Sequence, residues 1–239
     1  VVHTAGVAAS HPLDTLDDDA LAAVLSAKVT GATNLDAIFT ADTSTTSDTS
    51  EPHDKLDAFV LFSSIAGVWG SGGQAAYAAA NAHLDALAQD RRARGLTATS
   101  ISWGPWADGG MAAGEAEAEL LRRGLPAMVP ERGVTALQQA LAEGDTHVTV
   151  ADVDWTRFAP AFTALRPSPL LTGLPEVRDL QEEETAAAED GASALRDRLA
   201  AATAAERTRA LLELVRNQAA VVLAHGSASS VTAASTFRE

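Results

Sequence analysis

The chain contains no cysteine and has little positive charge. Its 239 residues include 17 Lys and Arg against 32 Asp and Glu, which gives a formal net charge of −15. The absence of cysteine excludes disulfide bonds, thiolate metal sites and a cysteine nucleophile, and it fits a reducing compartment. An acidic surface repels phosphate backbones and anionic membranes, so we expect no nucleic-acid or membrane partner. No apolar run of about 18 residues occurs, so no membrane-spanning helix is predicted.

Patterns that would indicate metal or hydrolase chemistry are also absent. The six histidines are scattered without the spacing of metal ligands, so no metal site is predicted. No Gly-x-Ser-x-Gly elbow is paired with a matching histidine, which argues against a serine hydrolase. Hydrophobic residues nevertheless make up 46% of the chain, enough for a substantial core.

Predicted strands and helices alternate along the first 153 residues. The chain opens on the end of a buried strand and a turn, Val1 to Gly6, so we expect earlier strands upstream of it. Further strands are predicted at 56–62, 97–103 and 147–153, and helices at 17–39, 75–94, 115–123 and 130–143. Residues 40–54 are polar and aperiodic, so we expect a solvated loop there. This alternation is typical of an open parallel α/β sheet.

The composition changes after residue 170. Residues 171–192 are acidic and Ala-rich, so we interpret them as an interdomain linker. Helical periodicity resumes at 193–199, and an amphipathic pattern follows at 205–225. One helix pair of this size cannot bury enough surface to fold alone, so the tail is expected to be a fragment of a second domain or to need a partner.

The rest of the chain is organised around residues 61–81. An apolar strand ends there in Ser63 and Ser64, a Gly-rich loop follows, and a helix then carries Tyr77 and Asn81 on one face. Tyr77 is the only tyrosine of the chain. Because ligands of open α/β sheets bind at the carboxyl ends of strands, Ser64 is a candidate to hold a carbonyl oxygen and Tyr77 to protonate it. Asn81 is a candidate to hold backbone, a lysine or a relay water.

Lys28 is the candidate cation for this site. A tyrosine with a pKa near 10 is a poor acid or base at neutral pH unless a cation lowers its pKa. Lys28 lies on the apolar stripe of the 17–39 helix, so it either packs its stem and reaches solvent or faces the site. Taken singly, Ser64 could be a helix cap, Tyr77 a packing residue and Asn81 a backbone partner. Their combination in one strand, loop and helix favours carbonyl reduction by a nicotinamide hydride.

The residues resemble the ketoreductase domain of modular type I polyketide synthases, a branch of the short-chain dehydrogenase/reductases. The resemblance covers Val1 to about Leu170, and its most specific segments are His3-Thr-Ala-Gly6, Ala27-Lys-Val-Thr-Gly-Ala32, Phe59-Val-Leu-Phe-Ser-Ser64, the Tyr77/Asn81 pair and Trp103-Gly-Pro-Trp106. It implies a ketoreductase catalytic region at 1–170, with a doubly wound, Rossmann-like sheet whose first strands are missing from this chain. It also implies a catalytic set of Lys28, Ser64, Tyr77 and Asn81. Ordinary members carry Tyr-x-x-x-Lys, whereas polyketide ketoreductases place Asn at the fourth position and take the lysine from the earlier helix.

The cofactor implied by the resemblance is NADPH. The residues expected to bind it are Ala5, Gly6, Lys28, Tyr77, Gly104, Pro105 and Trp106. The family's Gly-x-Gly-x-x-Gly fingerprint does not occur in this chain. We therefore expect the rest of the cofactor pocket, including what selects NADPH, to lie upstream, and the isolated chain to have no reductase turnover.

The resemblance also predicts the stereochemistry of the product. B-type ketoreductases carry Leu-Asp-Asp soon after the Ala-Gly turn, where this chain has Ala8-Ala9-Ser10. A-type enzymes carry a tryptophan eight residues before the tyrosine, and Trp69 stands there. The A2 subtype has histidine three residues before the tyrosine, where this chain has Gln74, which implies A1. We expect Trp69, Gln74 and Met111 to control an L-configured alcohol without epimerisation of an α-substituent.

The tail resembles the start of an acyl carrier domain. Residues 211–223 are similar to its first helix, so 193–239 are interpreted as a carrier fragment that stops before the serine bearing phosphopantetheine. The implied partners are a β-ketoacyl chain tethered to a carrier protein and the other domains of a homodimeric, cytoplasmic synthase. Two alternatives stay open: another short-chain carbonyl reductase, and a ketoreductase-like domain kept for scaffolding or epimerisation.

Overall fold

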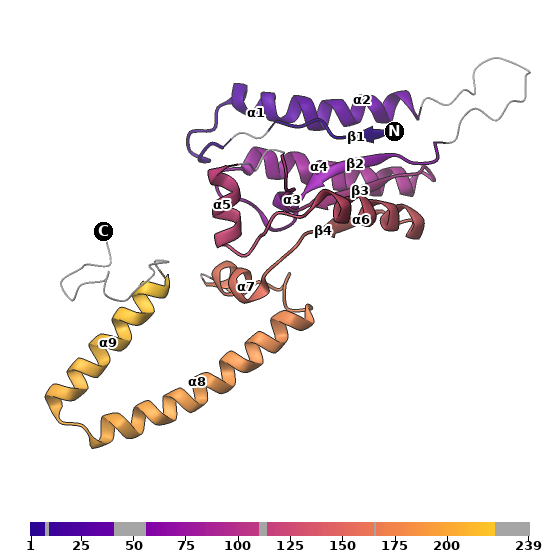
Figure 1. Ribbon diagram of the computed structural model, residues 1–239. Helices are drawn as coiled ribbons and strands as arrows, with labels where there is room; N and C mark the ends of the chain where they lie inside the picture. Colours follow the sequence, from indigo (N-terminus) through magenta and orange to yellow (C-terminus); the bar gives the residue numbers. More distant parts are fainter. Residues whose placement is uncertain (8–9, 41–55, 110–113, 165, 223–239) are drawn as a thin grey trace, which may run out of the picture. The chain divides into compact units, whose positions relative to one another are not determined.

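The computed structural model describes residues 1–7, 10–40, 56–109, 114–164 and 166–222 (Figure 1). Met111, the Ala8-Ala9 pair, nearly all of the predicted 40–54 loop and the end of the tail lie outside these residues. The chain divides into two compact units, Val1–Phe158 and Ala159–Glu239. No helix in the described ranges is long and apolar enough to cross a lipid bilayer.

The first unit is built on a four-stranded parallel sheet. Its strands are β1 (Val2–His3), β2 (Val60–Ser64), β3 (Thr99–Trp103) and β4 (His147–Val150), and they lie side by side in chain order. Ser64 pairs with Trp103, which pairs in turn with Val150, so the carboxyl ends of the last three strands form one edge. The predicted parallel α/β sheet is confirmed.

Helices connect the strands. Between β1 and β2 the chain forms α1 (Asp18–Leu25), the π-helical segment η1 (Ser26–Thr30) and α2 (Gly31–Ile38). The short α3 (Ile65–Trp69) and the long α4 (Ala75–Ala93) follow β2. Helices α5 (Glu115–Arg122) and α6 (Pro130–Glu143) lie between β3 and β4, and α7 (Trp155–Thr163) follows β4.

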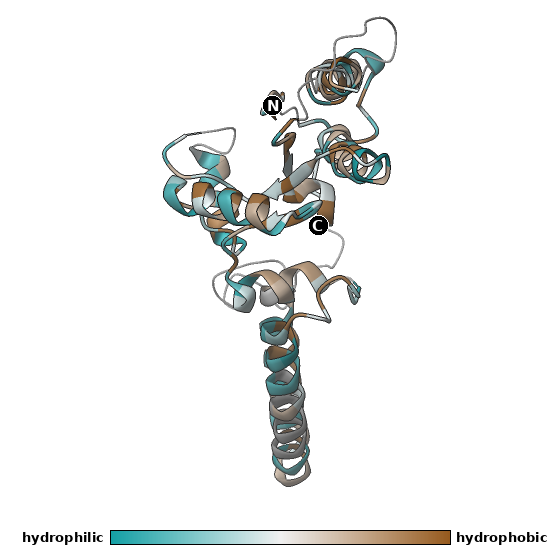
Figure 2. Cartoon of the chain, turned by 90° about the vertical axis from the view of Figure 1, so that its right-hand side faces the viewer, coloured by the Kyte–Doolittle hydropathy of each residue, from teal (hydrophilic) through white to brown (hydrophobic). Residues whose placement is uncertain are grey.

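Helices cover both faces of this sheet, as Figure 2 shows. Side chains alternate along each strand, so Leu61 of β2 packs with Leu84 of α4 and Ala32 of α2 on one face. The other face carries a cluster of Ile101, Trp103, Met128 and Ala140, with Phe62, Trp106 and other partly buried side chains packed against it. The α4 face thus carries the helices on which Lys28, Tyr77 and Asn81 lie.

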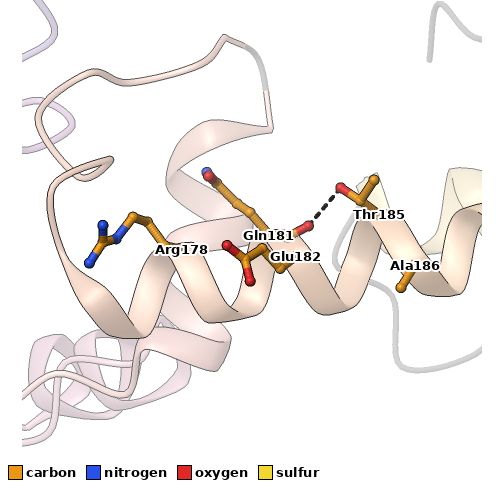
Figure 3. A pocket seen from close by; sticks show the side chains of 5 residues that line it. All are labelled: Arg178, Gln181, Glu182, Thr185 and Ala186. Atoms are coloured by element: carbon orange, nitrogen blue, oxygen red, sulfur yellow. Dashed lines mark hydrogen bonds between the residues drawn. The ribbon is translucent and has the colours of Figure 1, made fainter.

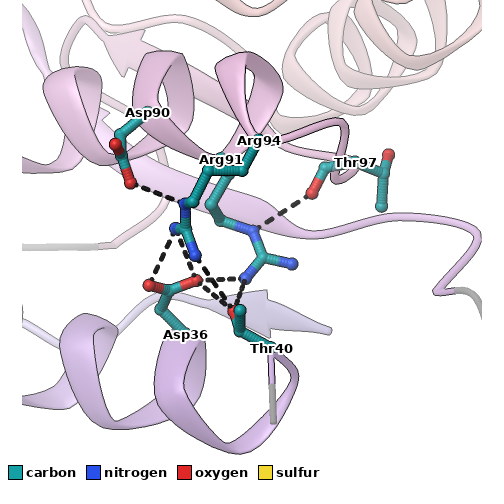
Figure 4. Close-up of polar contacts among 6 residues, drawn as sticks. All are labelled: Asp36, Thr40, Asp90, Arg91, Arg94 and Thr97. Carbon is teal, nitrogen blue, oxygen red and sulfur yellow. Dashed lines mark hydrogen bonds and ion pairs between the residues drawn. The ribbon is translucent and has the colours of Figure 1, made fainter. Parts of the chain in front are cut away.

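An ion-pair network joins the last turns of α2 and α4 (Figure 4). Arg91 is 1% exposed, lies with its guanidinium 3.9 Å from the Phe59 ring centroid, and pairs with Asp36. Arg94 also pairs with Asp36, at 2.9 Å. Burial alone would raise the pKa of Asp36, but hydrogen bonds from Thr40, Arg91 and Arg94 outweigh it and lower that pKa. Because Phe59 immediately precedes β2, this network holds the end of the sheet opposite to Ser64.

Three features of these elements were predicted wrongly from the sequence: the start of one strand and the absence of two short helices. The β2 strand begins at Val60 rather than Leu56 and includes both Ser63 and Ser64. Residues after Ser64, predicted as a Gly-rich loop, first form α3, because the Ser64 side chain caps its free N–H groups. Helix α7 was not predicted at all; it is short and contains Pro160, so it shows little helical periodicity.

The second unit contains two long helices, α8 (Pro175–Ala201) and α9 (Ala204–Val222). Most of the predicted 171–192 linker therefore lies within α8, in one helix with the predicted 193–199 segment. Ala and Glu have high helix propensity, which explains why an acidic Ala-rich stretch forms a helix without an apolar stripe. A shallow hollow on α8 is lined by Arg178, Gln181, Glu182, Thr185 and Ala186 and holds none of the predicted site residues (Figure 3).

Candidate active site

Ser64 lies at the carboxyl end of β2 and begins α3. Its Oγ accepts a hydrogen bond of 3.2 Å from the backbone N–H of Ala66, and its extended backbone is that of an N-cap residue. Ser64 is therefore a helix cap, as one of its two interpretations predicted. The hydroxyl hydrogen is not used by this bond, so Ser64 can still donate to a second oxygen.

Tyr77 and Asn81 are held on the buried face of α4. Tyr77 is 7% exposed and Asn81 is fully buried, with its Nδ2 donating 2.7 Å to the backbone carbonyl of Tyr77. Helix α3 packs closely here, since a Cβ on Gly67 would lie 3.0 Å from both the Ala82 nitrogen and Asn81 Cβ. Glycine at position 67 thus lets the Ser64 segment approach the helix that carries the phenol.

Lys28 reaches the same place from the π-helical segment η1. Its side chain is 2% exposed, and its Nζ donates a hydrogen bond of 2.8 Å to the backbone carbonyl of Phe62 in β2. The same Nζ lies 5.4 Å from the centroid of the Tyr77 ring. The π turn is defined by a hydrogen bond from the Gly31 N–H to the Ser26 carbonyl, five residues back. Of the two interpretations of Lys28, the structure supports the inward-facing lysine.

The pKa values of these groups are set mainly by burial. Burial lowers the pKa of Lys28 to about 8, while the charge of Asp85 acts in the opposite direction. Burial raises the pKa of Tyr77, and hydrogen bonding with Ser64 and Asn81 opposes this rise. The predicted lowering of the Tyr77 pKa by Lys28 is therefore wrong here, because desolvation of the phenol outweighs its contacts. At neutral pH Tyr77 keeps its proton and Lys28 is mostly charged.

Two of the residues predicted to control stereochemistry, Trp69 and Gln74, lie on either side of the loop between α3 and α4. Trp69 is the last residue of α3, and its ring lies 5.3 Å from that of Phe158. Gln74 immediately precedes α4, three residues before Tyr77, and its side chain makes no capping hydrogen bond. Met111 lies outside the described residues.

The predicted cofactor residues fall into two groups. Ala5 is exposed, and Gly6 touches the lysine stem, since a Cβ there would lie 2.9 Å from Lys28 Cε. Gly104 packs on Ala151, whose Cβ would be 2.8 Å from an added Cβ, and Pro105 accepts a hydrogen bond from Met128. Trp106 packs among Phe62, Trp103 and Gly133. The contacts of Gly104, Pro105 and Trp106 are packing and backbone contacts within the protein. These contacts alone account for the residue types at the three positions.

A buried polar cluster beside the site was missed from the sequence. Asp85 of α4 accepts hydrogen bonds from Ser100 and Ser102 of β3, and His147 of β4 lies next to them. The alternation of serines at 100 and 102, facing an aspartate one turn after Asn81, was the available signal.

Comparisons with known proteins agree with this geometry. Residues 1–108 match the family model described as the KR domain. Over its whole length the chain is 50% identical to polyketide synthase GfsA of Streptomyces halstedii and 49% identical to the pikromycin polyketide synthase component PikAIII of Streptomyces venezuelae. It spans only 3% and 15% of those two proteins.

Solved structures give the same result. An A1-type ketoreductase is 47% identical with a TM-score of 0.68, over 75% of this chain and 36% of that one. The first ketoreductase of the tylosin polyketide synthase is 52% identical with a TM-score of 0.66, over 75% of this chain and 37% of that one.

The sheet, its two helix layers and the Ser, Tyr and Lys side chains at its carboxyl edge define an oxidoreductase fold of the short-chain dehydrogenase/reductase class. Within that class, the chain belongs to the ketoreductase (KR) domains of modular polyketide synthases. The resemblance seen in the sequence is thereby confirmed. The KR match ends at residue 108 and does not extend to the tail.

Membership of this class implies a nicotinamide cofactor, and the residues present fit one end of it. Asn81 Oδ1 is buried without a hydrogen-bond partner among the described residues, and Lys28 Nζ has one protein acceptor for its three protons. These groups suit the hydroxyl-rich ribose beside the nicotinamide. The absence of a side chain at Gly6 leaves room for the Lys28 stem, since a Cβ there would lie 2.9 Å from Lys28 Cε.

Proposed function

We propose that this chain is the catalytic part of a β-ketoacyl reductase domain that acts, with NADPH, on a chain tethered to an acyl carrier protein. The observation that supports it is the convergence of Lys28, Ser64, Tyr77 and Asn81 from three separate elements on the carboxyl end of β2. The product would be a β-hydroxyacyl thioester. The interpretation of 1–170 as the catalytic region, 171–192 as linker and 193–239 as a carrier fragment belongs to this proposal, as do a homodimeric parent and a cytoplasmic location.

The proposed mechanism assigns each side chain one role. When bound beside Lys28 and Asn81, a nicotinamide cofactor would supply the hydride that the carbonyl carbon accepts. Ser64 and Tyr77 hold the carbonyl oxygen, and the Tyr77 hydroxyl, which keeps its proton because burial raises its pKa, transfers that proton to the oxygen. Lys28 stabilises the tyrosinate that forms, since most of its ammonium is charged below pH 8. Asn81 fixes the turn of α4 that carries Tyr77.

The proposed product has the A1 configuration, an L-alcohol with an unchanged α-substituent. Trp69 and Gln74 support this assignment, and an A1-type ketoreductase is among the similar structures. A C2-type ketoreductase is also similar, at 44% identity and a TM-score of 0.61, so the assignment depends on the two residues rather than on overall likeness.

Replacing Tyr77 with Phe in the full parent module tests the proposal. Loss of the proton donor is expected to lower kcat for a diketide thioester by about 100- to 10,000-fold. The exposed Asp90→Asn on the same helix is the matched control and should retain activity. Unchanged reduction by Tyr77→Phe would instead favour the scaffolding or epimerising alternative. Chiral chromatography of the native product gives the second result: a D-alcohol contradicts the A1 assignment and leaves the reductase proposal intact.

A further inference from the structure

Asp85 is a buried carboxylate that the mechanism above does not use. It lies on α4 four residues after Asn81 and is 7% exposed. Its Oδ1 accepts a hydrogen bond of 2.6 Å from the Ser100 hydroxyl, and its Oδ2 accepts one of 3.4 Å from the Ser102 hydroxyl. Burying a carboxylate costs several kcal/mol unless hydrogen bonds compensate, so α4 is favoured in the one position where both serines of β3 reach Asp85.

A contact between two serines joins this cluster to the turn that carries Asn81. The Ser102 hydroxyl has one hydrogen, which it can donate either to Asp85 Oδ2 or to Ser63 Oγ at 3.3 Å. Ser63 in turn donates a hydrogen bond of 3.2 Å to the backbone carbonyl of Asn81. Ser63, Ser100 and Ser102 are at most 5% exposed. Helix α4 is therefore tied to β2 through Asn81 and to β3 through Asp85, one turn apart.

The Ser102, His147 and Asp85 side chains do not form a second catalytic site. His147 Nε2 lies 3.0 Å from Ser102 Oγ and 3.5 Å from Asp85 Oδ2, so a single nitrogen faces both groups. A Ser-His-Asp triad needs the serine and the carboxylate on opposite ring nitrogens. Ser102 is also fully buried and beyond the reach of a substrate.

Asp85 is also the acidic side chain that acts on Lys28. From β1, His3 faces the lysine backbone, with Nε2 3.2 Å from the Lys28 carbonyl, and burial lowers the pKa of His3 so that it is neutral at pH 7. From α4, Tyr77 lies over the ammonium and is neutral as well. The Asp85 charge favours the protonated lysine against the effect of burial.

We propose that Asp85 is a positioning residue of this site: it holds α4 in register on β2 and β3 so that Tyr77 and Asn81 meet Ser64. The inference rests on the proposed function for its catalytic consequence. The register role stands on the contacts of Asp85 alone. The effect of the Asp85 charge on Lys28 can be measured separately, in the 239-residue chain and without turnover.

The composition of the chain makes that test direct. Only Lys28 and Lys55 are lysines, so selective ¹³Cε-lysine labelling gives two NMR signals that can be followed against pH. In Asp85→Asn, the titration midpoint of Lys28 is expected to move to lower pH than in the native chain, because the balancing charge is lost. Lys55 serves as the internal reference, and Asp90→Asn, which removes an exposed carboxylate from the same helix, should leave Lys28 unchanged. Equal Lys28 midpoints in Asp85→Asn and the native chain would show that the Asp85 charge does not act on Lys28, and Asp85→Glu then decides the positioning role.

Asp85→Glu separates charge from position. It keeps the carboxylate but adds a methylene, so the two serine hydroxyls no longer meet it in the same place. In the parent module kcat for a diketide thioester is expected to fall about tenfold or more with little change in KM, since small displacements of catalytic groups have effects of this size. Lys28 should titrate close to its native midpoint.

The outcomes distinguish the inference from the function on which it rests. If Tyr77→Phe abolishes reduction while Asp85→Glu and Asp85→Asn leave kcat unchanged, the positioning role is wrong and the reductase proposal stands. If Tyr77→Phe leaves reduction unchanged, the proposed function fails and the catalytic consequence of Asp85 fails with it, whereas the Lys28 titration still shows whether the Asp85 charge acts on Lys28. Circular dichroism checks that each variant folds. Should Asp85→Asn not fold, Asp85→Glu still tests the positioning role, and its unchanged kcat overturns it.

Discussion

At the scale of single residues, the ammonium group of Lys28 is the most telling feature. It is held almost wholly out of water, yet it donates to the Phe62 carbonyl and faces the Tyr77 ring. Its pKa of about 8 lies well below the ordinary value of 10.5, so the folded state releases this proton more readily than the unfolded state does. A buried cation in this position destabilises the fold that holds it.

This burial predicts how stability depends on pH. Below about pH 8 both states carry the proton, and burying the charge costs about 3 kcal/mol. As pH rises from 8 towards 10.5 the folded state loses the proton first, so this cost disappears and the free energy of unfolding rises. Lys28→Met should abolish this rise, whereas Lys55→Met should keep it. Urea unfolding of the three chains at pH 7 and pH 10 measures the effect, and an equal pH dependence in Lys28→Met contradicts it.

The residues that converge at the candidate site could be singled out from sequence because each stands in a short motif at a strand end or on one helix face. Asp85 could not, because its role depends on serines about 15 residues further along the chain. The pKa of Tyr77 was predicted in the wrong direction for a similar reason. A sequence shows which charges are available, whereas burial depends on how the elements pack.

At the scale of elements, long helices with clear end signals were predicted well. The predicted 75–94 helix matches α4 to within one residue, since an Arg cluster and Gly95 mark its end. Helix α3 has only five residues, too few for periodicity, so no helix was predicted there although Ser64 was recognised as a possible helix cap. Helix α6 likewise begins at the Pro130 and ends at the Gly144 that its sequence signals indicate.

The contact between α2 and α4 predicts an uneven pair of substitutions. Arg91→Met removes a fully buried guanidinium and leaves the Asp36 carboxylate with only its outer partner, so we expect a loss of about 3 kcal/mol in the free energy of unfolding. Arg94→Met removes that outer partner, which is 34% exposed, and should cost at most about 1 kcal/mol. Urea denaturation gives both values, and equal losses would show that burial of Arg91 is not what matters.

At the scale of the whole molecule, the two units differ in how fully their apolar side chains are buried. The first unit surrounds a sheet with fully buried residues such as Phe59, Leu61 and Ile101. Helix α9 of the second unit instead leaves Leu211, Leu212, Leu214 and Val215 between 38% and 49% exposed. The alternation of strands and helices predicted the first unit. In the second unit, the amphipathic pattern at 205–225 predicted the helix that forms α9, whereas composition predicted a linker where the chain forms most of α8.

Hydrogen exchange followed by mass spectrometry should separate the two units. Amides of β2 and β3 are expected to exchange only through global unfolding, since they lie in the buried centre of the sheet. Amides of α9 should exchange much faster, through local opening, because little apolar surface holds this helix in place. Equal protection in α9 and β3 would mean that α9 is packed far more tightly than its exposed leucines indicate.

The π turn at Lys28 makes the position of the lysine side chain sensitive to the number of residues in this helical segment. A π turn holds one residue more than an α-helical turn, so a deletion within α1 or η1 can be absorbed by conversion of η1 to regular helix. Each residue of an α-helix turns the chain by about 100°, and that conversion would rotate the Lys28 side chain away from the Phe62 carbonyl. The helix would keep its packing while the site lost its cation. A single-residue deletion within α1 or η1 is thus expected to displace Lys28 from the site without unfolding the domain.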